Sequence, residues 1–159
     1  MSWFNSDSLL LKFGTEKSTS TPTGEYRTLG PKHMVETKIS AATLTTTDVI
    51  LGDVTLIPKS AILESVEIDV EAGCSGGTTV SIGLMKTDRT TTLGATALLN
   101  AETTTNLQTT GKVLLYDATT TNHGTLLGTA ITVPAHITAK CAGTYTTGAL
   151  VVRTFYRQP

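Results

Sequence analysis

Threonine occupies 34 of the 159 positions of this chain and is spread from Thr15 to Thr154. A β-branched hydroxyl residue is restricted in a helix but packs well on the pleated surface of a sheet. The composition therefore predicts a β-protein whose surface carries hydroxyl and methyl groups in place of many charges. Threonine clusters at 45–47, 90–92, 103–105 and 119–121 fall mostly in expected loops. There they offer a surface that costs little to desolvate in a subunit contact.

Charge is scarce and balanced in this sequence. Charged residues make up 16%, and the formal net charge is -1, whereas soluble domains typically contain about 25% charged residues. Between residues 90 and 139 only Glu102, Lys112 and Asp117 are charged. This favours burial of the stretch in a subunit interface, or in contact with a larger assembly, over simple exposure. A partner that is nucleic acid or an anionic membrane is not indicated.

The length and the absence of long apolar runs give further expectations. At 159 residues the chain predicts one domain with a single sizeable core. No apolar run approaches the roughly 18 residues of a membrane-spanning helix, and the N-terminus lacks the succession of a signal peptide. We therefore expect the protein to remain in the compartment where it is made.

Residues 1–32 are predicted to form an extended arm. Half of the eight aromatic residues lie there, namely Trp3, Phe4, Phe13 and Tyr26. Glycine, proline and a run of serine and threonine interrupt any strand or helix period. Large apolar side chains on such a segment need a surface to pack on, either on the arm's own domain or on a neighbouring molecule. Simple disorder is the third alternative, which the apolar content disfavours.

From residue 33 onward the sequence predicts short strands. Apolar and polar residues alternate, or apolar runs stop at turn residues, over residues 34–39, 48–51, 54–57, 65–71, 79–85, 112–116, 127–133, 135–142 and 149–156. Gly52 and Asp53 suit a tight turn or a bulge, and Pro134 suggests a bend or a change of sheet. Residues 93–103 are the only passage that could form a short helix.

The arrangement of these strands predicts an all-β, jelly-roll-like antiparallel sandwich over residues 33–159. Residues 65–71 and 79–85 are expected to form an antiparallel hairpin across a glycine-rich turn. Residues 149–156 are partly apolar on both faces, which favours a central strand. Eight or nine strands with long crossing loops favour a jelly roll over an immunoglobulin-like sandwich.

The sequence contains no recognisable catalytic, cofactor-binding or metal-binding set. His33, His123 and His136 have no ligand spacing, and His136 is expected to face solvent. Cys74 and Cys141 are expected to be free thiols, although a bridge between them is an alternative. Residues 73–77 are interpreted as a turn and not as a nucleophile elbow.

Three carboxylates lie on one face of a predicted strand. Glu67, Asp69 and Glu71 are spaced by two residues, and such a row most often lies on a solvated strand face. Gathering a cation or meeting a basic partner is the alternative. Lys86, Asp88 and Arg89 are interpreted as a charged hairpin loop.

Several segments resemble a known family. Residues 9–17 (LLLKFGTEK), 24–31 (GEYRTLGP), 56–70 (LIPKSAILESVEIDV) and 79–84 (TVSIGL) are similar to the small structural proteins encoded beside the major capsid protein in tailed bacteriophages. These proteins are capsid decoration, or cement, proteins with a jelly-roll core. The resemblance covers the arm and the first half of the domain best, and residues 90–147 match only in their threonine, alanine and glycine content.

The resemblance implies a homotrimer that binds the outside of the assembled head and bridges neighbouring subunits of the major capsid protein. Such a protein is made in the host bacterial cytoplasm and resides on the exterior of the virion. It is not an enzyme and needs no cofactor, small-molecule substrate, nucleic acid or membrane. The charge-poor face would form the trimer contact. Carried onto this chain, the arm residues that would anchor to capsid or to a sister subunit are Trp3, Phe4, Leu9, Leu10, Leu11, Phe13, Tyr26 and Arg27.

Two other function classes compete with this expectation. A β-sandwich associated with the phage tail or neck could recognise a host glycan or a partner protein, and Tyr116 and Tyr145 are the aromatic residues available in its loop regions. An enzyme built on a jelly roll, such as a lyase or an esterase, is disfavoured because no acid–base or nucleophile set is present.

Overall fold

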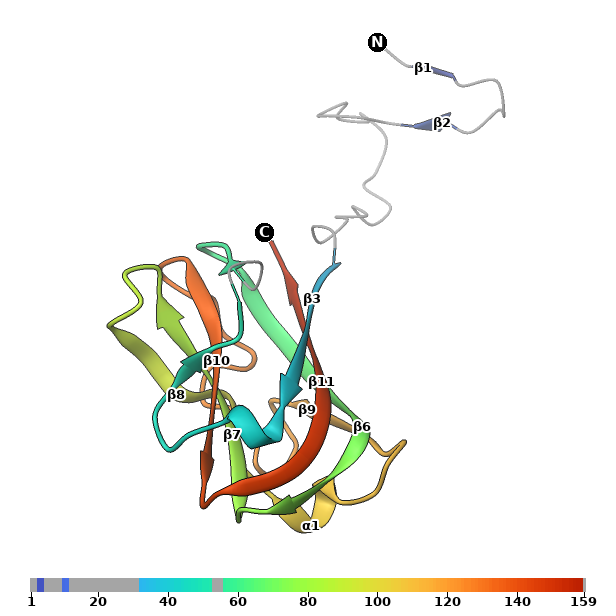
Figure 1. The fold of residues 1–159 in the computed structure, drawn as a ribbon. Helices are drawn as coiled ribbons and strands as arrows, with labels where there is room; N and C mark the ends of the chain where they lie inside the picture. The colour runs from blue at the N-terminus through green and yellow to red at the C-terminus, as the bar shows by residue number, and fades with distance from the viewer. Residues whose placement is uncertain (1–2, 5–9, 12–31, 53–55, 159) are drawn as a thin grey trace.

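The computed structural model describes residues 3–4, 10–11, 32–52 and 56–158, and these residues are mostly β-strand (Figure 1). The strands are β1 (Trp3–Phe4), β2 (Leu10–Leu11), β3 (Lys32–Ser40), β4 (Val49–Ile50), β5 (Leu56–Ile57), β6 (Ile62–Gly76), β7 (Thr79–Lys86), β8 (Thr92–Thr103), β9 (Val113–Asp117), β10 (Ala135–Ala142) and β11 (Tyr145–Arg157). A 3-10 turn, η1 (Ala41–Thr43), and a one-turn helix, α1 (Thr104–Leu107), complete the described elements.

Two antiparallel sheets pack face to face, which confirms the predicted all-β sandwich. One sheet has the order β3-β11-β6-β9, and the other has the order β4-β10-β7-β8 with β5 also paired to β10. Strand β11 lies between β3 and β6, the central position that its two partly apolar faces predicted. Strands β1 and β2 form a separate two-stranded ribbon.

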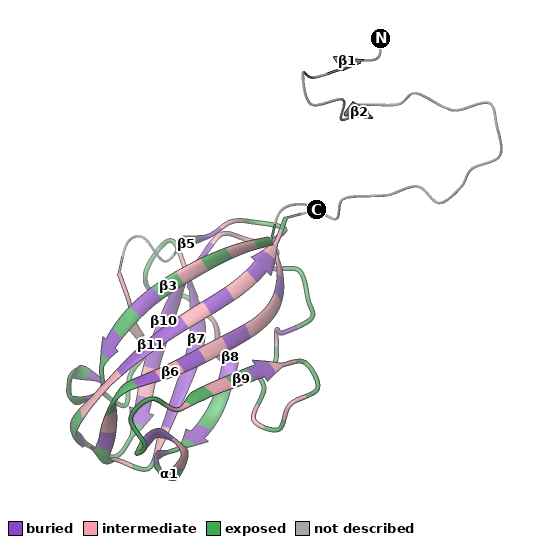
Figure 2. Ribbon diagram, turned by 90° about the vertical axis from the view of Figure 1, so that its right-hand side faces the viewer, coloured by how far each residue is buried: buried purple, intermediate pink, exposed green. Residues whose placement is uncertain are grey.

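The core lies between the two sheets, and Figure 2 shows buried positions alternating with less buried ones along β6. Both sheets contribute fully buried aliphatic side chains, and in the second sheet β7 and β10 are buried at nearly every position. The first sheet supplies Val66, Ile68, Val70, Leu150 and Val152, and the second supplies Val80, Ile82, Leu84, Ile137 and Ala139. Full burial of a valine, leucine or isoleucine side chain contributes about 1.5–3 kcal/mol, so these strands hold the sandwich together.

The predicted hairpin between residues 65–71 and 79–85 is wrong, because its two strands belong to different sheets. Strand β6 pairs with β11 and β9, whereas β7 pairs with β10 and β8. An alternating strand looks the same in sequence whether its neighbour pairs beside it or faces it across the core. The periodicity was therefore correct and the pairing was not.

The link from β6 to β7 runs beside the link from β10 to β11. The Gly77 N–H donates to the Thr144 carbonyl at 2.8 Å, and the Thr78 N–H donates to the Ala142 carbonyl at 2.7 Å. The four strands thus form one long antiparallel ribbon that folds over at this corner. Gly77 has φ +58°, and a Cβ there would lie 2.3 Å from the Tyr145 ring, so the corner requires glycine.

Residues 127–133 do not form the predicted strand. They belong to a bridging loop, residues 118–134, which connects β9 in one sheet to β10 in the other. The Gly124 and Leu126 N–H groups donate to Leu98 and Ala97 in β8, while the Gly128 N–H donates to Leu63 in β6. A Cβ on Gly124 would lie 2.2 Å from the Ala97 carbonyl oxygen, so the loop can approach β8 only with glycine there. Strand β10 begins directly after Pro134, as expected of a bend.

The possible helix at residues 93–103 is also wrong, since this passage forms β8. Ala97, Leu98 and Leu99 are all fully buried, and the pairing with β7 contains register shifts between the Ile82, Leu84 and Met85 positions. Burial of consecutive residues hides the two-residue period, and tertiary packing overrides the helix propensity of alanine and leucine. The helix α1 starts one residue after the predicted one would end.

The predicted strands at 48–51 and 54–57 correspond to the short strands β4 and β5. Both pair antiparallel with β10, at Thr138 and Ala139 and at Ala135 and His136 respectively. They therefore follow each other along one edge and are not two arms of a hairpin. Asp53 itself lies outside the described residues.

Candidate functional site

The predicted arm residues are only partly described. Trp3 and Phe4 form β1, Leu10 and Leu11 form β2, and the register pairs Trp3 with Leu11 and Phe4 with Leu10. The other four residues, Leu9, Phe13, Tyr26 and Arg27, lie outside the described residues. The structure thus brings four of the eight together in a small antiparallel ribbon. What this ribbon contacts stays a prediction.

The outer face of the β3-β11-β6-β9 sheet carries a network of ion pairs centred on Arg153. Its guanidinium lies 2.8 Å from Glu36, 2.5 Å from Glu67 and 3.6 Å from Asp69. The hydrogen bonds that Arg153 donates to Glu36 and to Glu67 raise the pKa of the guanidinium above its ordinary value. Lys38 pairs with Glu71 at 2.7 Å, and that hydrogen bond raises the pKa of the lysine.

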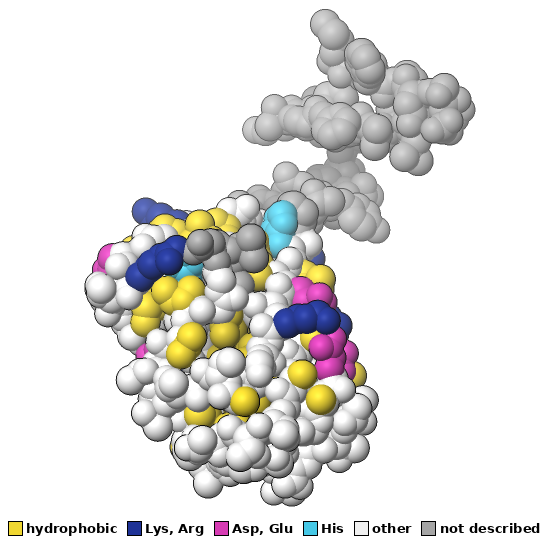
Figure 3. All heavy atoms as spheres, viewed as in Figure 1, with side chains coloured by type: hydrophobic (Ala, Val, Ile, Leu, Met, Phe, Trp, Pro, Cys, Tyr) yellow, Lys and Arg dark blue, Asp and Glu magenta, His cyan; other side chains and the backbone are white. Residues whose placement is uncertain are grey.

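The predicted acidic row is therefore neutralised by basic side chains of neighbouring strands. The row is partly exposed, as expected, but each member has a basic partner on the same sheet. Figure 3 shows these blue and magenta side chains gathered together at one side of the domain. A free cation site at this row is not supported, and no group of three or more potential metal-ligating side chains occurs among the described residues.

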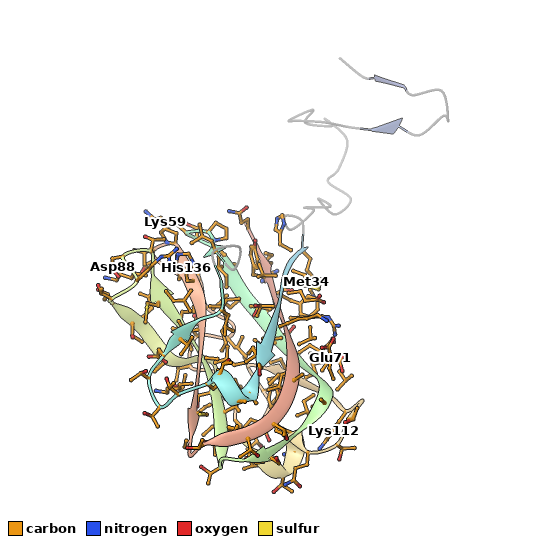
Figure 4. The ribbon with its side chains drawn as sticks, in the orientation of Figure 1. Met34, Lys59, Glu71, Asp88, Lys112 and His136 are labelled. Carbon is orange, nitrogen blue, oxygen red and sulfur yellow. The ribbon has the colours of Figure 1, made fainter. Side chains whose placement is uncertain are left out.

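Exposed apolar side chains lie beside the charged network, on the two edge strands of the sheet. Val113 and Leu115 in β9 are 55% and 57% exposed, and Met34 in β3 is 50% exposed. Val113 lies opposite Asp69, and Leu115 lies opposite Glu67. Figure 4 places Met34, Glu71 and Lys112 along one side of the domain. The middle of this sheet face is thus charged, and its β9 edge is apolar. The sequence predicted residues 112–116 as a strand but did not indicate that this strand forms an apolar edge.

The buried carboxylate of Glu102 connects β8, α1 and the bridging loop. Glu102 is 2% exposed and accepts hydrogen bonds from the side-chain amides of Asn106 at 2.7 Å and Asn122 at 3.3 Å. Lys112 in turn donates to Asn106 at 2.9 Å. Burial by itself raises the pKa of Glu102, but hydrogen bonds from Asn106, Tyr116 and Asn122 outweigh it, so the pKa is lowered. The scarcity of charge around Glu102 was the one signal of this network in the sequence.

Two aspartates organise threonine-rich loops. The carboxylate of Asp88 accepts hydrogen bonds from the Thr90 and Thr91 N–H groups, in the β7–β8 hairpin loop that the sequence predicted. Asp117 accepts hydrogen bonds from the hydroxyls of Thr119 and Thr120, and these bonds lower its pKa to about 2. Part of the threonine excess thus serves to fix loops.

The histidine and cysteine expectations have different outcomes. His136 was expected to face solvent, which is wrong: it is 7% exposed, because Leu56 of β5 and Met85 of β7 flank it in the sheet. Figure 4 shows it at the opposite end of the domain from Lys112. Cys74 and Cys141 are both free thiols, as predicted, and both are buried.

The aromatic residues proposed for a glycan site are not accessible. Tyr116 is 5% exposed and Tyr145 is 2% exposed. The Tyr145 hydroxyl lies 2.7 Å from the Thr104 hydroxyl, so both rings belong to the interior. This geometry argues against the glycan-binding alternative. No helix in the described part of the chain is long and apolar enough to cross a membrane.

Comparison with known proteins gives structural similarity without sequence matches. No protein-family model and no curated protein matches this chain. A chain in the capsid of Ralstonia phage GP4 is similar with a TM-score of 0.56 and 19% identity, over 90% of this chain and 92% of that chain. A chain in the capsid asymmetric unit of cyanophage Pam1 is similar with a TM-score of 0.54 and 15% identity, over 92% and 98%. The similarity shows a shared fold.

Proposed function

We propose that this chain is a non-enzymatic phage structural protein that binds the outside of the assembled capsid as a trimer. There it stabilises, or cements, neighbouring subunits of the major capsid protein. The observation that carries the proposal is that two phage capsids contain chains whose fold matches this one over at least nine-tenths of both partners. The sequence resemblance to decoration proteins, which rests on other observations, points the same way.

The surface chemistry supports a role in assembly. The outer face of the β3-β11-β6-β9 sheet is nearly self-neutralised by its own ion pairs, and three large apolar side chains are exposed on it or at its edges. A surface of this kind contacts a partner without leaving uncompensated charges. Trimerisation multiplies weak contacts, because three linked contacts raise the avidity by orders of magnitude.

Capsid binding is the direct test. Purified protein is added to capsids that lack it and, separately, to unassembled major capsid protein, and binding is measured by co-sedimentation. We expect saturable binding to assembled capsids, a mass in solution equal to three chains, and a higher temperature of capsid disruption. Equal binding to free subunits, or none to capsids, would contradict the proposal.

The arm is tested by a truncation that leaves the sandwich intact. Since β3 begins at Lys32, which pairs with Glu64 at 3.2 Å, the deletion removes residues 1–31 only. We expect the truncated protein to keep its melting temperature and to lose capsid binding. A truncated protein that decorates capsids as well as the full chain would refute the anchoring role of the arm.

A further inference from the structure

Among the described strands, β9 is the one sheet edge that is both apolar and unprotected. Strand β3, at the other edge of the same sheet, exposes Lys32, Glu36 and Lys38, and charged side chains are a common protection against strand addition. In the second sheet, β4 and β5 have two residues each, and β8 accepts hydrogen bonds from the bridging loop. Strand β9 has the sequence VLLYD, with a charge only at its last residue.

The backbone of β9 is oriented to accept another strand. The Val70 N–H donates to the Lys112 carbonyl at 2.9 Å, so residue 112 turns its backbone groups toward β6. Backbone groups alternate in direction along an antiparallel strand. Val113 and Leu115 therefore direct their N–H and C=O groups to the free edge, and their side chains are more than half exposed. An added strand would find both hydrogen-bonding groups and apolar contacts.

The same chain contains a strand ribbon without a supporting sheet. Strands β1 and β2 have two residues each and pair only with each other among the described strands. A two-stranded ribbon is marginally stable at best in water and needs further strands or a packing surface. Its residues Trp3, Phe4, Leu10 and Leu11 are all large and apolar, which suits contact with Val113 and Leu115.

The length of the connecting segment is compatible with docking on another copy. Twenty residues separate Leu11 from Lys32, and when extended they span up to about 66 Å. A ribbon on a segment of this length can reach a neighbouring copy, and the experiments below distinguish that occupant from the chain's own domain.

We propose that the β1–β2 ribbon of one copy adds to the β9 edge of a second copy and extends its four-stranded sheet. The inference rests on the proposed function in so far as that function requires self-association. Around a closed ring each copy donates one ribbon and accepts one. The arm then holds the oligomer together in addition to any contact with the capsid.

Edge variants test the acceptor side. The double variant Val113→Lys, Leu115→Lys places charges on the edge, and Leu56→Lys on β5 is the control because Leu56 is a large apolar side chain, 42% exposed, on the other sheet. Analytical ultracentrifugation over a concentration series should show association weakened at least tenfold for the double variant and for the deletion of 1–31, and unchanged for Leu56→Lys. A monomeric wild-type protein, or an unchanged association constant in the double variant, would overturn the inference.

Complementation separates exchange between copies from docking of an arm on its own domain. The deletion of 1–31 keeps an intact acceptor edge, and the double variant keeps an intact ribbon. We expect the two proteins to form a one-to-one complex when mixed, although neither associates alone. If they remain monomers on mixing, the second copy is not the occupant.

Amide hydrogen exchange reads the site directly. The Val113 and Leu115 amides should exchange at least tenfold more slowly in the associated wild-type protein than in the deletion of 1–31. If slow exchange persists at concentrations where the protein is monomeric, the occupant of the β9 edge is the chain's own arm. If exchange is slow only on capsids, the occupant is a strand of a capsid protein. Either result overturns the inference. Capsid decoration is scored separately, so a protein that decorates capsids without this protection refutes the edge contact alone.

Discussion

Replacing Glu102 by glutamine tests the buried network that anchors the bridging loop. The carboxylate is 2% exposed, and its two oxygens are used by different donors. Oε1 accepts from Asn106 and Oε2 accepts from Asn122. Glutamine preserves the volume but replaces one oxygen with an NH2 group, which then faces a donor. At least one hydrogen bond to a charged group is lost in the variant.

The magnitude follows from this loss. A hydrogen bond to a charged group contributes about 1.5–3 kcal/mol, and a buried donor left unpaired costs about 1–3 kcal/mol. We therefore expect Glu102→Gln to reduce the free energy of unfolding by about 2–3 kcal/mol at pH 7. For a chain of this size, about 1 kcal/mol corresponds to 2–4 °C in Tm, so the melting temperature should fall by about 4–12 °C.

The effect should depend on pH in a defined direction. The pKa of Glu102 is lowered in the folded protein from its ordinary value of 4.5. A lowered folded-state pKa stabilises the protein above the unfolded-state pKa, and that stabilisation is lost as the pH falls through the folded-state value. The difference in the free energy of unfolding between wild type and Glu102→Gln should therefore be constant from pH 7 to about pH 5. It should become smaller below pH 4.5.

Urea denaturation at several pH values from 3 to 7 measures this gap. Glu71→Gln is the control, because Glu71 is exposed and pairs only at the surface with Lys38. A loss below about 0.5 kcal/mol for Glu102→Gln, or a gap that stays constant down to pH 3, would show that the network does not hold an ionised carboxylate.

Three further predictions follow from single sites. Gly124→Ala should lower the free energy of unfolding by about 1–3 kcal/mol in urea denaturation, because its Cβ would meet Ala97; Gly111→Ala, which meets nothing within 4 Å but has φ +80°, is a control for backbone strain alone. Cys74 and Cys141 should react with a thiol reagent only slowly in the native protein, because burial raises the pKa of both thiols, and two thiols per chain should react in urea; fast native reaction would contradict their burial. Arg153→Met should lower Tm at low salt and much less in 1 M NaCl, since exposed ion pairs are screened; a loss that is independent of salt would contradict an electrostatic role.

Strand existence and the fold class could be predicted because they depend on local residue patterns. Alternation identified β3, β6, β7, β10 and β11, and the density of β-branched residues identified the class. What the sequence could not provide was the identity of strand neighbours. Residues 65–71 and 79–85 alternate equally well as paired or as facing strands, and only long-range contacts such as Gly77 with Thr144 decide between the two.

The misassigned segments fail for a common physical reason. Residues 93–103 and 127–133 both depend on the bridging loop, which forms backbone hydrogen bonds to β8 and to β6. Neither segment shows a regular alternation of apolar and polar residues, because packing against residues distant in sequence decides which of its side chains are buried. The same long-range packing buries His136, whose alternating position predicted exposure. For the arm, the sequence did not indicate the pairing of β1 with β2, and the contact role of the arm residues stays a prediction.

The scarcity of charge between residues 90 and 139 acquires a specific meaning from the structure. The stretch is not one face, since it includes β8 in one sheet, β9 in the other and most of β10. Its three charged residues all have internal partners: Glu102 binds Asn106 and Asn122, Lys112 binds Asn106, and Asp117 binds its own loop. Each charged group is therefore hydrogen-bonded within the chain. A partner strand that docks on β9 would displace water from Val113 and Leu115 without having to desolvate a charged group of this stretch that lacks hydrogen-bond partners, so this scarcity of charge favours the edge contact.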